Sequence, residues 1–443
     1  MEYTKALARF IAETRYEDLP ESVLEKARTY VLDNLASALV GSRQPWCQMV
    51  LEMVKEACSK GECTVIGQGW KAAPSLAALA NGATIGGFET DHFYLEGSAH
   101  PSGTAFPAAL AVGEKLGCTG RDLLTAMVVG YEALCRIGYA ATRAVEDIRG
   151  FHGPGANGPF GAAAAAARIL GLSPEGVTNA LGIAGSQGAG LLEFVAEGAM
   201  TKRLHLGRAA QTGLESALLA ARGFTGPSTV LEGAHGFFRV YSGQALPERL
   251  LDGLGKTFLM EGIRIKSYAC HGTFQAVIEA LAHFKASHPL EPAAIRRVHV
   301  AAPRRVAERH GNPVPTTVMG TQYSLPFSVA IALCKDPEEP MSFGEESLWD
   351  PEVRALAGRV ELEAKEEPGF RVRMETRSGA IDIEATTFKG APDRPFTFAD
   401  ASEKFYRYAE PVIGRETAQG VVTAVKQLER LPSIRELTEL LRH

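Results

Sequence analysis

The pattern of apolar and polar positions divides the chain into parts, the first of which extends from about residue 20 to about residue 260. Apolar residues recur there at steps of three and four, which is typical of amphipathic helices. The stretch 20–41 has Pro20 in its first turn and ends at Gly41, as a capped helix does. Further stretches rich in Ala, Leu and Gly follow the same pattern at 75–88, 103–117, 120–141, 158–172, 173–192 and 206–224. Because small residues let helices approach closely, we expect a tightly packed helical domain.

The pattern changes after about residue 262. Residues 295–303 and 359–390 alternate apolar and polar positions with turn signals between them, which predicts antiparallel strands. Helical patterns return at 272–288 and 325–334. Segregated strands and helices of this kind indicate a smaller α+β domain, which we place at residues 262–394.

The last segment, 395–443, is helical again and is expected to pack on the first domain. The predicted fold class is therefore mainly α with an inserted α+β domain: residues 1–261 and 395–443 form a large helical domain, and residues 262–394 form the insertion. Ligand sites favour the cleft between two such domains.

Composition narrows the class of ligand. The chain has 443 residues, 46% of them hydrophobic, and a formal net charge of −5. This balance gives no electrostatic footprint for nucleic acid or an anionic membrane, so we expect a small-molecule ligand. The first residues lack the pattern of a signal peptide, and no uninterrupted apolar run reaches the ~18 residues of a membrane span. We expect a cytoplasmic protein.

Cysteine usage bears on cofactors. The cysteines number seven and show no CxxC spacing, which favours reduced thiols over a disulfide framework or a zinc ribbon. Their spacing also matches none of the usual runs that hold iron–sulfur clusters. We expect neither a metal nor a cofactor.

Proton-handling residues gather in the segment 89–103, just before the apolar stretch that follows. Histidine exchanges protons near neutral pH, and neighbouring carboxylates can complete an acid/base set. Within HPSG, Pro101 makes a stiff turn that holds His100 at the start of a helix. A solvated polar loop is the plainer interpretation of this segment. The polar residues are Glu89, Asp91, His92, Tyr94, Glu96 and His100.

A second histidine, His152, lies in a glycine-rich block. Gly153, Gly155 and Gly158 match GxGxxG, but a dinucleotide site needs a strand before the first glycine, and residues 143–152 are too polar for one. We therefore reject that interpretation. A glycine-rich helix start still presents backbone N–H groups and a positive dipole end to a carboxylate.

Three further elements carry cationic or proton-handling groups. Each also has an ordinary interpretation: a solvated basic helix face, a structural histidine, or a tyrosine that serves packing. Taken together, they have the composition of a pocket for a small polycarboxylate, in which cations neutralise carboxylates and histidines move protons. The groups are Lys202, Arg203, His205 and Arg208, then Lys266 and His271 at the predicted domain boundary, and Tyr323.

Five ordered blocks carry a family resemblance. They are HPSGTAFPAALAVGE, GFHGPGANGPFGAAAAAARILGLS, MTKRLHLGRAAQTG, KSYACHG and TQYSLPFSVAIAL. In this order they resemble the MmgE/PrpD family, which includes 2-methylcitrate dehydratase, cis-aconitate decarboxylase and iminodisuccinate epimerase. The resemblance implies a helical domain with an inserted α+β lid, a homodimer, and chemistry that needs no metal or cofactor.

The resemblance also implies roles for individual residues. Where many relatives have a run like DFDD, this chain has ETDH, so that Glu89 and Asp91 take two of the acidic positions and His92 replaces an acid. The implied catalytic residues are His100, His152, His271, Lys266 and Tyr323. The implied substrate-binding residues are Glu89, Asp91, Lys202 and His205.

The implied activity is that of a cofactor-independent lyase, a dehydratase or decarboxylase that acts on a small di- or tricarboxylate. Its histidines transfer protons and its lysines stabilise the enolate-like charge. Two alternatives stay open: a dicarboxylate epimerase of the same fold, and a carboxylate-binding protein without catalysis.

Overall fold

The computed structural model describes residues 2–288 and 290–443, which divide into two compact units. The first unit comprises the residues up to Leu192, Thr201–Ile263 and Phe396–His443, and the second comprises Glu193–Met200 and Arg264–Pro395. The sequence analysis assigns residues 193–200 to the helical domain, whereas the structure groups them with the second unit. The other boundaries lie within two residues of the predicted ones.

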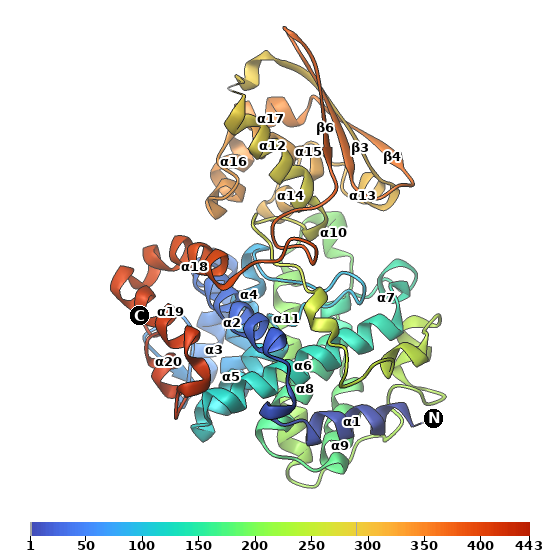
Figure 1. Cartoon of the computed structure of the whole chain (residues 1–443), viewed down its shortest axis with the longest axis vertical. Helices are drawn as coiled ribbons and strands as arrows, with labels where there is room; N and C mark the ends of the chain where they lie inside the picture. The colour runs from blue at the N-terminus through green and yellow to red at the C-terminus, as the bar shows by residue number, and fades with distance from the viewer. Residues whose placement is uncertain (1, 289) are drawn as a thin grey trace. The chain divides into compact units, whose positions relative to one another are not determined.

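The first unit is almost entirely helical (Figure 1). A short antiparallel pair, β1 (Cys63–Thr64) with β2 (Lys71–Ala72), is its small sheet. Its α-helices are α1 (Tyr3–Glu13), α2 (Glu21–Ser42), α3 (Pro45–Ala57), α4 (Pro74–Ile85), α5 (Ala105–Leu116), α6 (Gly120–Ala141), α7 (Ala144–Asp147), α8 (Gly153–Ile169), α9 (Pro174–Gly185), α11 (Thr201–Ala220), α18 (Phe398–Ile413), α19 (Arg415–Lys426) and α20 (Arg435–Glu439).

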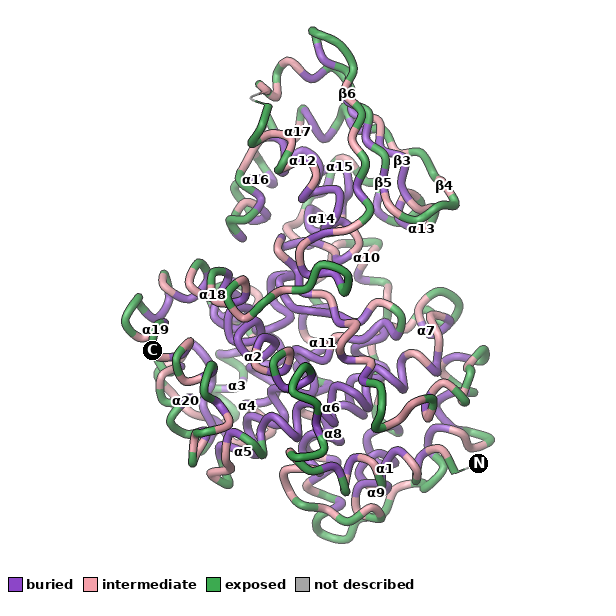
Figure 2. The backbone as a smooth tube through the Cα atoms, viewed as in Figure 1, coloured by how far each residue is buried: buried purple, intermediate pink, exposed green. Residues whose placement is uncertain are grey.

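Helix α8 forms the centre of this unit. Every residue from Gly153 to Ala167 is buried, and Figure 2 shows the buried course of this helix among its neighbours. Helices α6, α11, α5 and α9 all pack against it. At Gly130 of α6, an added Cβ would lie 2.7 Å from the Cβ of Ala165, closer than real Cβ atoms approach. Small side chains therefore set the helix spacing, as the sequence predicts.

Helix α6 is also the longest apolar helix of the unit. Among the described residues, it is the one helix that length and composition would allow to cross a membrane, and 94% of its most apolar window is buried inside the protein. The burial is typical of a core helix.

The C-terminal segment returns to the first unit. Helix α18 packs along α2, although most of the sequence separates them (Figure 1). The predicted fold class is confirmed, because one helical unit is built from both ends of the chain around an α+β insertion.

The second unit holds a four-stranded sheet in the order β4-β3-β5-β6. Helices α12 and α15 pack against each other, and α12 also contacts β5 and β6. The strands are β3 (Ile295–Pro303), β4 (Val360–Lys365), β5 (Phe370–Thr376) and β6 (Gly379–Ala385), and the α-helices are α10 (Phe194–Glu197), α12 (Gln275–Ser287), α13 (Arg304–Arg309), α14 (Val318–Gln322), α15 (Leu325–Cys334), α16 (Glu345–Trp349) and α17 (Pro351–Ala357).

One strand pairing differs from the prediction. Strand β3 pairs with β5, and β5 with β6, in antiparallel fashion, but β3 and β4 are parallel. A parallel neighbour requires a long crossover connection, which the helices between β3 and β4 supply. The prediction of antiparallel strands is confirmed for the pairs β3–β5 and β5–β6 and is wrong for β3–β4, because the alternation of apolar and polar residues does not fix strand direction.

Candidate active site

The segment 89–103 connects α4 and its terminal 3-10 turn (Gly86–Phe88) to α5. Two of its residues, Glu89 with φ 58° and Ser98 with φ 45°, adopt left-handed backbone conformations although neither is glycine. Such residues cost about 1–3 kcal/mol each and gather at functional sites. The backbones of Tyr94 and Ala99 exchange two hydrogen bonds of 2.8 and 3.1 Å, so the segment folds into a tight loop. Asp91 and His100 lie on its two arms.

Asp91 and His100 form a close pair. Nδ1 of His100 lies 2.6 Å from Oδ2 of Asp91, and the Ser102 hydroxyl is 3.2 Å from the same oxygen. The carboxylate is fully buried, whereas 17% of the His100 side chain is exposed. A carboxylate accepts hydrogen bonds, so Nδ1 carries the proton and Nε2 is the nitrogen that can exchange one. The sequence assigns Asp91 to substrate binding, which stays a prediction, and the structure places its carboxylate against His100.

His152 and His205 form a second pair. His152 precedes the first turn of α8, and its Nδ1 lies 3.0 Å from Nδ1 of His205 on α11. Only one of the two facing nitrogens can carry a proton in this contact, so the tautomers of the two rings are coupled. One ring therefore presents an Nε2–H donor at its other end, and the partner ring presents an Nε2 acceptor.

The electrostatics keep both rings neutral near pH 7. Burial lowers the pKa of His152 well below its usual value, and the charges of His205, Lys202 and His100 lower it further, while Asp91 opposes them. Burial and Lys202 lower the pKa of His205 to about 4. The side chains that act on the His152 ring are thus His205, Lys202, His100 and Asp91, all of them in the first unit.

Lys202 belongs to the same group. It is buried at the start of α11 and makes a buried ion pair with Glu89. Its basic neighbours have other partners: the Arg203 guanidinium lies 3.7 Å from the ring centroid of Trp46, and Arg208 donates to Gln211 at 2.8 Å. The basic cluster seen in the sequence thus contributes Lys202 and His205 to the site.

The start of α8 already faces a carboxylate. The Gly153 N–H donates to Glu146 at 3.2 Å, and Glu146 also accepts from Ser98 and Arg143. The N–H group of Gly153 is therefore taken by a side chain of the protein, and binding of a ligand carboxylate at this helix start stays a prediction. Residues 144–147 are helical rather than extended, which agrees with the rejection of a dinucleotide site.

The second unit holds another group of predicted site residues. The His271 ring centroid lies 5.0 Å from that of Tyr323 and 4.5 Å from that of His310. His310 donates from Nδ1 to the Tyr323 carbonyl at 3.0 Å, and His271 Nδ1 lies 2.8 Å from the Thr273 hydroxyl. Lys266 is buried in the same unit. Sequence analysis predicts that both groups act on one substrate, and this stays a prediction.

Comparison with known proteins identifies the family. A model described as the MmgE/PrpD N-terminal domain matches residues 5–250, and one described as the MmgE/PrpD C-terminal domain matches residues 268–430. This chain belongs to the MmgE/PrpD family. Its membership agrees with the resemblance that the five sequence blocks carry.

Curated relatives of this MmgE/PrpD chain match it over nearly its whole length. It is 30% identical to the cis-aconitate decarboxylase-like protein oryM of Aspergillus oryzae, over 99% of this chain and 97% of that protein. It is 30% identical to cis-aconitate decarboxylase of Aspergillus terreus, over 99% and 95%. Its identity to cis-aconitate decarboxylase of Homo sapiens is 29%, over 99% and 94%.

The remaining polar residues of the segment 89–103 have other surroundings in the MmgE/PrpD chain. His92 is fully buried, with Nδ1 2.7 Å from Asp33 of α2 and Nε2 3.0 Å from the Tyr131 hydroxyl of α6. The Tyr94 ring is also buried, whereas Glu96 is exposed. The plainer interpretation, a solvated polar loop, is wrong for most of the segment because its side chains are enclosed.

Sequence analysis of the MmgE/PrpD chain misses two site residues, His310 and Ser102. Ser102 lies inside the HPSG block, and the short spacing between this block and Asp91 is the sequence signal that could have identified it. No local pattern marks His310, because its contact with His271 joins residues that are far apart in sequence.

The described residues show no cluster of side chains arranged as metal ligands and no disulfide. No group of three or more His, Cys, Asp and Glu side chains there has the geometry to hold a metal ion. The seven cysteines are free, as the sequence predicts.

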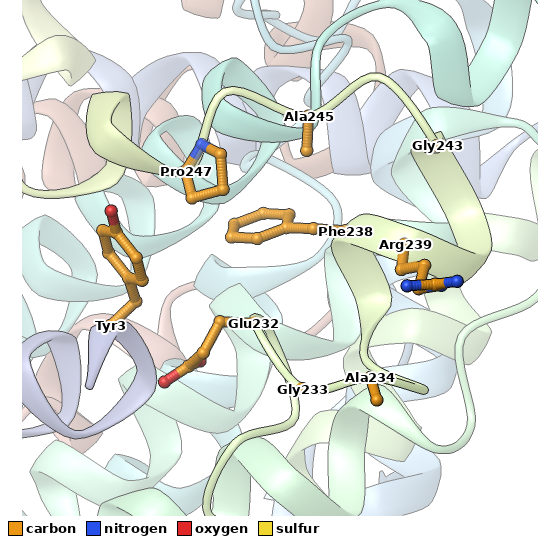
Figure 3. Close-up of a pocket in the computed structure, with 9 residues that line it drawn as sticks. All are labelled: Tyr3, Glu232, Gly233, Ala234, Phe238, Arg239, Gly243, Ala245 and Pro247. Atoms are coloured by element: carbon orange, nitrogen blue, oxygen red, sulfur yellow. The ribbon is translucent and has the colours of Figure 1, made fainter. Parts of the chain in front are cut away.

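A surface hollow of about 500 Å³ lies elsewhere in the first unit of the MmgE/PrpD chain. Figure 3 shows the residues that line it, among them Tyr3, Glu232, Phe238, Arg239 and Pro247. The Glu232 carboxylate accepts from the Thr4 N–H and hydroxyl, so it stabilises the start of α1. None of the predicted site residues lines this hollow, and we do not assign it to catalysis.

Proposed function

We propose that this chain is a lyase that acts on a small di- or tricarboxylate, with decarboxylation of a cis-aconitate-like acid as the favoured reaction. The observation that carries the proposal is the pairing of buried Asp91 with the partly exposed His100. A carboxylate that holds Nδ1–H orients an imidazole and stabilises its protonated form. Nε2 can then deliver a proton to carbon and recover it from solvent.

The chemistry matches the groups of the first unit. In decarboxylation the bond to the departing carboxylate breaks, its electron pair spreads over the adjacent unsaturated or carboxylate-bearing carbons, and an acid delivers a proton to carbon. In dehydration a base removes the proton next to a carboxylate, and an acid protonates the leaving hydroxyl. Neither reaction changes the redox balance, so neither consumes an oxidant or a reductant.

Charge supports an anionic substrate with an enolate-like intermediate. Lys202 places a buried ammonium beside Glu89, so that the pair is neutral as a whole while the lysine can stabilise negative charge that develops nearby. Protonated His100 would balance Asp91 in the same way. A di- or tricarboxylate then needs further cations, and we propose that Lys266 is one of them.

The coupled pair His152–His205 supports a role in hydrogen bonding rather than in binding charge. Both rings are neutral near pH 7, so they offer one donor and one acceptor at fixed positions. Such a pair can orient a carboxylate or hydroxyl of the substrate without adding charge.

The relatives favour decarboxylation over dehydration. The Aspergillus terreus and Homo sapiens proteins are both named cis-aconitate decarboxylase, and the match covers 99% of this chain in each case. We also propose a homodimer and a cytoplasmic location, which stay expectations from the sequence.

The test is an NMR screen of purified, metal-free protein in D₂O against a panel that includes cis-aconitate, 2-methylcitrate and related acids. The proposal expects loss of carbon dioxide, or of water, from at least one acid, with one deuterium in a decarboxylated product. His271→Asn in the same assay tests whether the second group takes part. Deuterium exchange without loss of either small molecule would identify an epimerase, and binding without any reaction would identify a carboxylate-binding protein; both results contradict the proposal.

A further inference from the structure

A second buried polar cluster in the same unit includes His92, the sequence neighbour of Asp91. Its members are Asp33 on α2, His92 in the segment 89–103, and Lys404 on α18. Asp33 Oδ1 lies 2.6 Å from Lys404 Nζ, and Asp33 Oδ2 lies 2.7 Å from His92 Nδ1. The exposed fractions are 0% for Asp33 and His92 and 6% for Lys404.

Hydrogen bonds connect this cluster to two further side chains. Asp33 accepts from Lys404 and from His92 Nδ1–H. His92 Nε2 lies 3.0 Å from the Tyr131 hydroxyl, and that hydroxyl accepts from the Asn34 amide at 2.9 Å. Burial by itself would raise the pKa of Asp33, but Lys404 and His92 outweigh it and the pKa is lowered. The cluster thus contains the ion pair of Asp33 with Lys404, and the His92 ring lies between Asp33 and Tyr131.

Contacts of this cluster and of Ser102 hold the backbone on both sides of Asp91. Lys404 donates to the carbonyl of Thr90 at 2.8 Å. On the other side, the carbonyl of His92 lies 3.2 Å from the Ser102 hydroxyl, which is also 3.2 Å from Asp91 Oδ2. Glu89, which begins this segment, has a strained backbone conformation. Such a conformation persists only where the surrounding contacts hold it in place.

We infer that Asp33, His92 and Lys404 are positioning residues that fix Asp91 against His100, so that the C-terminal helix α18 takes part in setting the catalytic geometry. The expected effect on kcat rests on the proposed function, whereas the expected effect on the His100 tautomer does not. The reason is geometric: the carboxylate of Asp91 can direct the His100 tautomer only while the peptide units on either side of it keep their places. Small displacements of a catalytic group lower rates steeply.

The test compares the full-length double variant Asp33→Asn/Lys404→Met with a matched control, Glu114→Gln/Lys71→Met. The control pair is also a lysine with an enclosed carboxylate, at 3.0 Å, and Glu114 likewise accepts from a backbone N–H, that of Thr64. Glu114 lies on α5, Lys71 in β2 and Thr64 in β1, and none of the three belongs to the segment 89–103. Neither double variant changes the net charge. Asp33→Asn/Lys404→Met removes the Asp33–Lys404 ion pair, and the control removes the Lys71–Glu114 pair together with the Lys71–Glu439 pair.

Two readouts separate positioning from mere support of the fold. The first is the ¹⁵N spectrum of histidine-labelled protein, in which the His100 signals are assigned by comparison with His100→Gln. The wild type and the control are expected to keep His100 as the Nδ1–H tautomer. Asp33→Asn/Lys404→Met is expected to give a mixture of tautomers. The second is turnover: kcat of that variant falls at least about tenfold with a smaller change in KM, and the control retains kcat within about twofold.

A milder variant, His92→Gln, keeps the experiment decisive if the double variant does not fold. It leaves the ion pair intact and preserves only one of the two ring contacts, so the same changes are expected with smaller size. A variant that folds with lowered Tm but retains the His100 tautomer and kcat would overturn the inference. A wild-type protein without turnover would contradict the proposed function. Because the ¹⁵N spectrum needs no substrate, it would still decide whether the inference holds.

Discussion

At the scale of single residues, Asp91 and His92 are neighbours in sequence with different tasks. Asp91 contacts His100, while His92 points into the cluster with Asp33 and Lys404. Sequence analysis selects both as candidates for chemistry because of their residue types, but side-chain direction depends on the folded loop. The pattern of α18 does offer a signal, since Lys404 lies on the buried stripe with Ala401, Phe405 and Tyr408, where a lysine needs a partner.

The ionisation of His310 gives a prediction for stability. Burial, together with Arg309, lowers the pKa of His310 to about 4, although its hydrogen bond to the Tyr323 carbonyl opposes the shift. An unfolded histidine titrates near ~6.5, so between about pH 6.5 and pH 4 the unfolded chain binds the extra proton. The free energy of unfolding therefore falls as the pH falls through this range. We expect the Tm of His310→Asn to decrease less than the Tm of the wild type when the pH is lowered from 7 to 4.5.

The control for this prediction is His283→Asn, because His283 is exposed on α12 of the same unit. It should follow the wild-type dependence of Tm on pH. Equal slopes for the wild type, His310→Asn and His283→Asn would show that His310 accepts its proton as readily in the folded protein as in the unfolded chain, which contradicts the account.

At the scale of elements, helices were more predictable than the sheet. Helix α6 occupies the predicted 120–141 and β3 the predicted 295–303. The helical pattern predicted for 173–192 extends too far. Helix α9 ends at Gly185, and Gly190 has a φ of 108°, which no regular helix permits. The periodicity of apolar residues predicts the buried face of a helix or strand reliably, because it reflects burial. It does not indicate the direction of a strand or the residue at which a helix ends.

The packing of α11 on α8 gives a prediction about elements. A Cβ added at Gly213 would contact the Pro159 carbonyl and lie 2.5 Å from the Ala162 Cβ and 2.6 Å from the Ala163 nitrogen. Two of these atoms belong to the backbone and cannot move without a shift of the helix. We expect Gly213→Ala to lower the free energy of unfolding by about 1–3 kcal/mol in chemical denaturation.

The matched control is Gly420→Ala in α19, where an added Cβ meets only the Leu440 side chain at 3.6 Å. There the higher helix propensity of alanine should stabilise the protein by about 0.5–1 kcal/mol. If Gly213→Ala were as stable as Gly420→Ala, close contact between α8 and α11 would not be what fixes their spacing.

At the scale of the whole molecule, the sequence predicts the helical unit with its α+β insertion, and the ordered blocks predict the family. These features are visible because they depend on periodicity and on residue types in order. The pairings within the first unit, His100 with Asp91 and His152 with His205, were not predictable in the same way. They depend on how α8, α11 and the segment 89–103 pack, which no single stretch of sequence encodes.

The central claim is that this chain is a lyase whose proton transfer runs through His100. The most direct measurement is kcat for the wild type, His100→Asn and the control His235→Asn, an exposed histidine, with the acid found by the NMR screen. The account predicts a loss of about 10²–10⁴-fold for His100→Asn, with unchanged Tm, and wild-type turnover for the control. Turnover by His100→Asn within about threefold of the wild type, or no lyase reaction by the wild type with any acid of the panel, would contradict it.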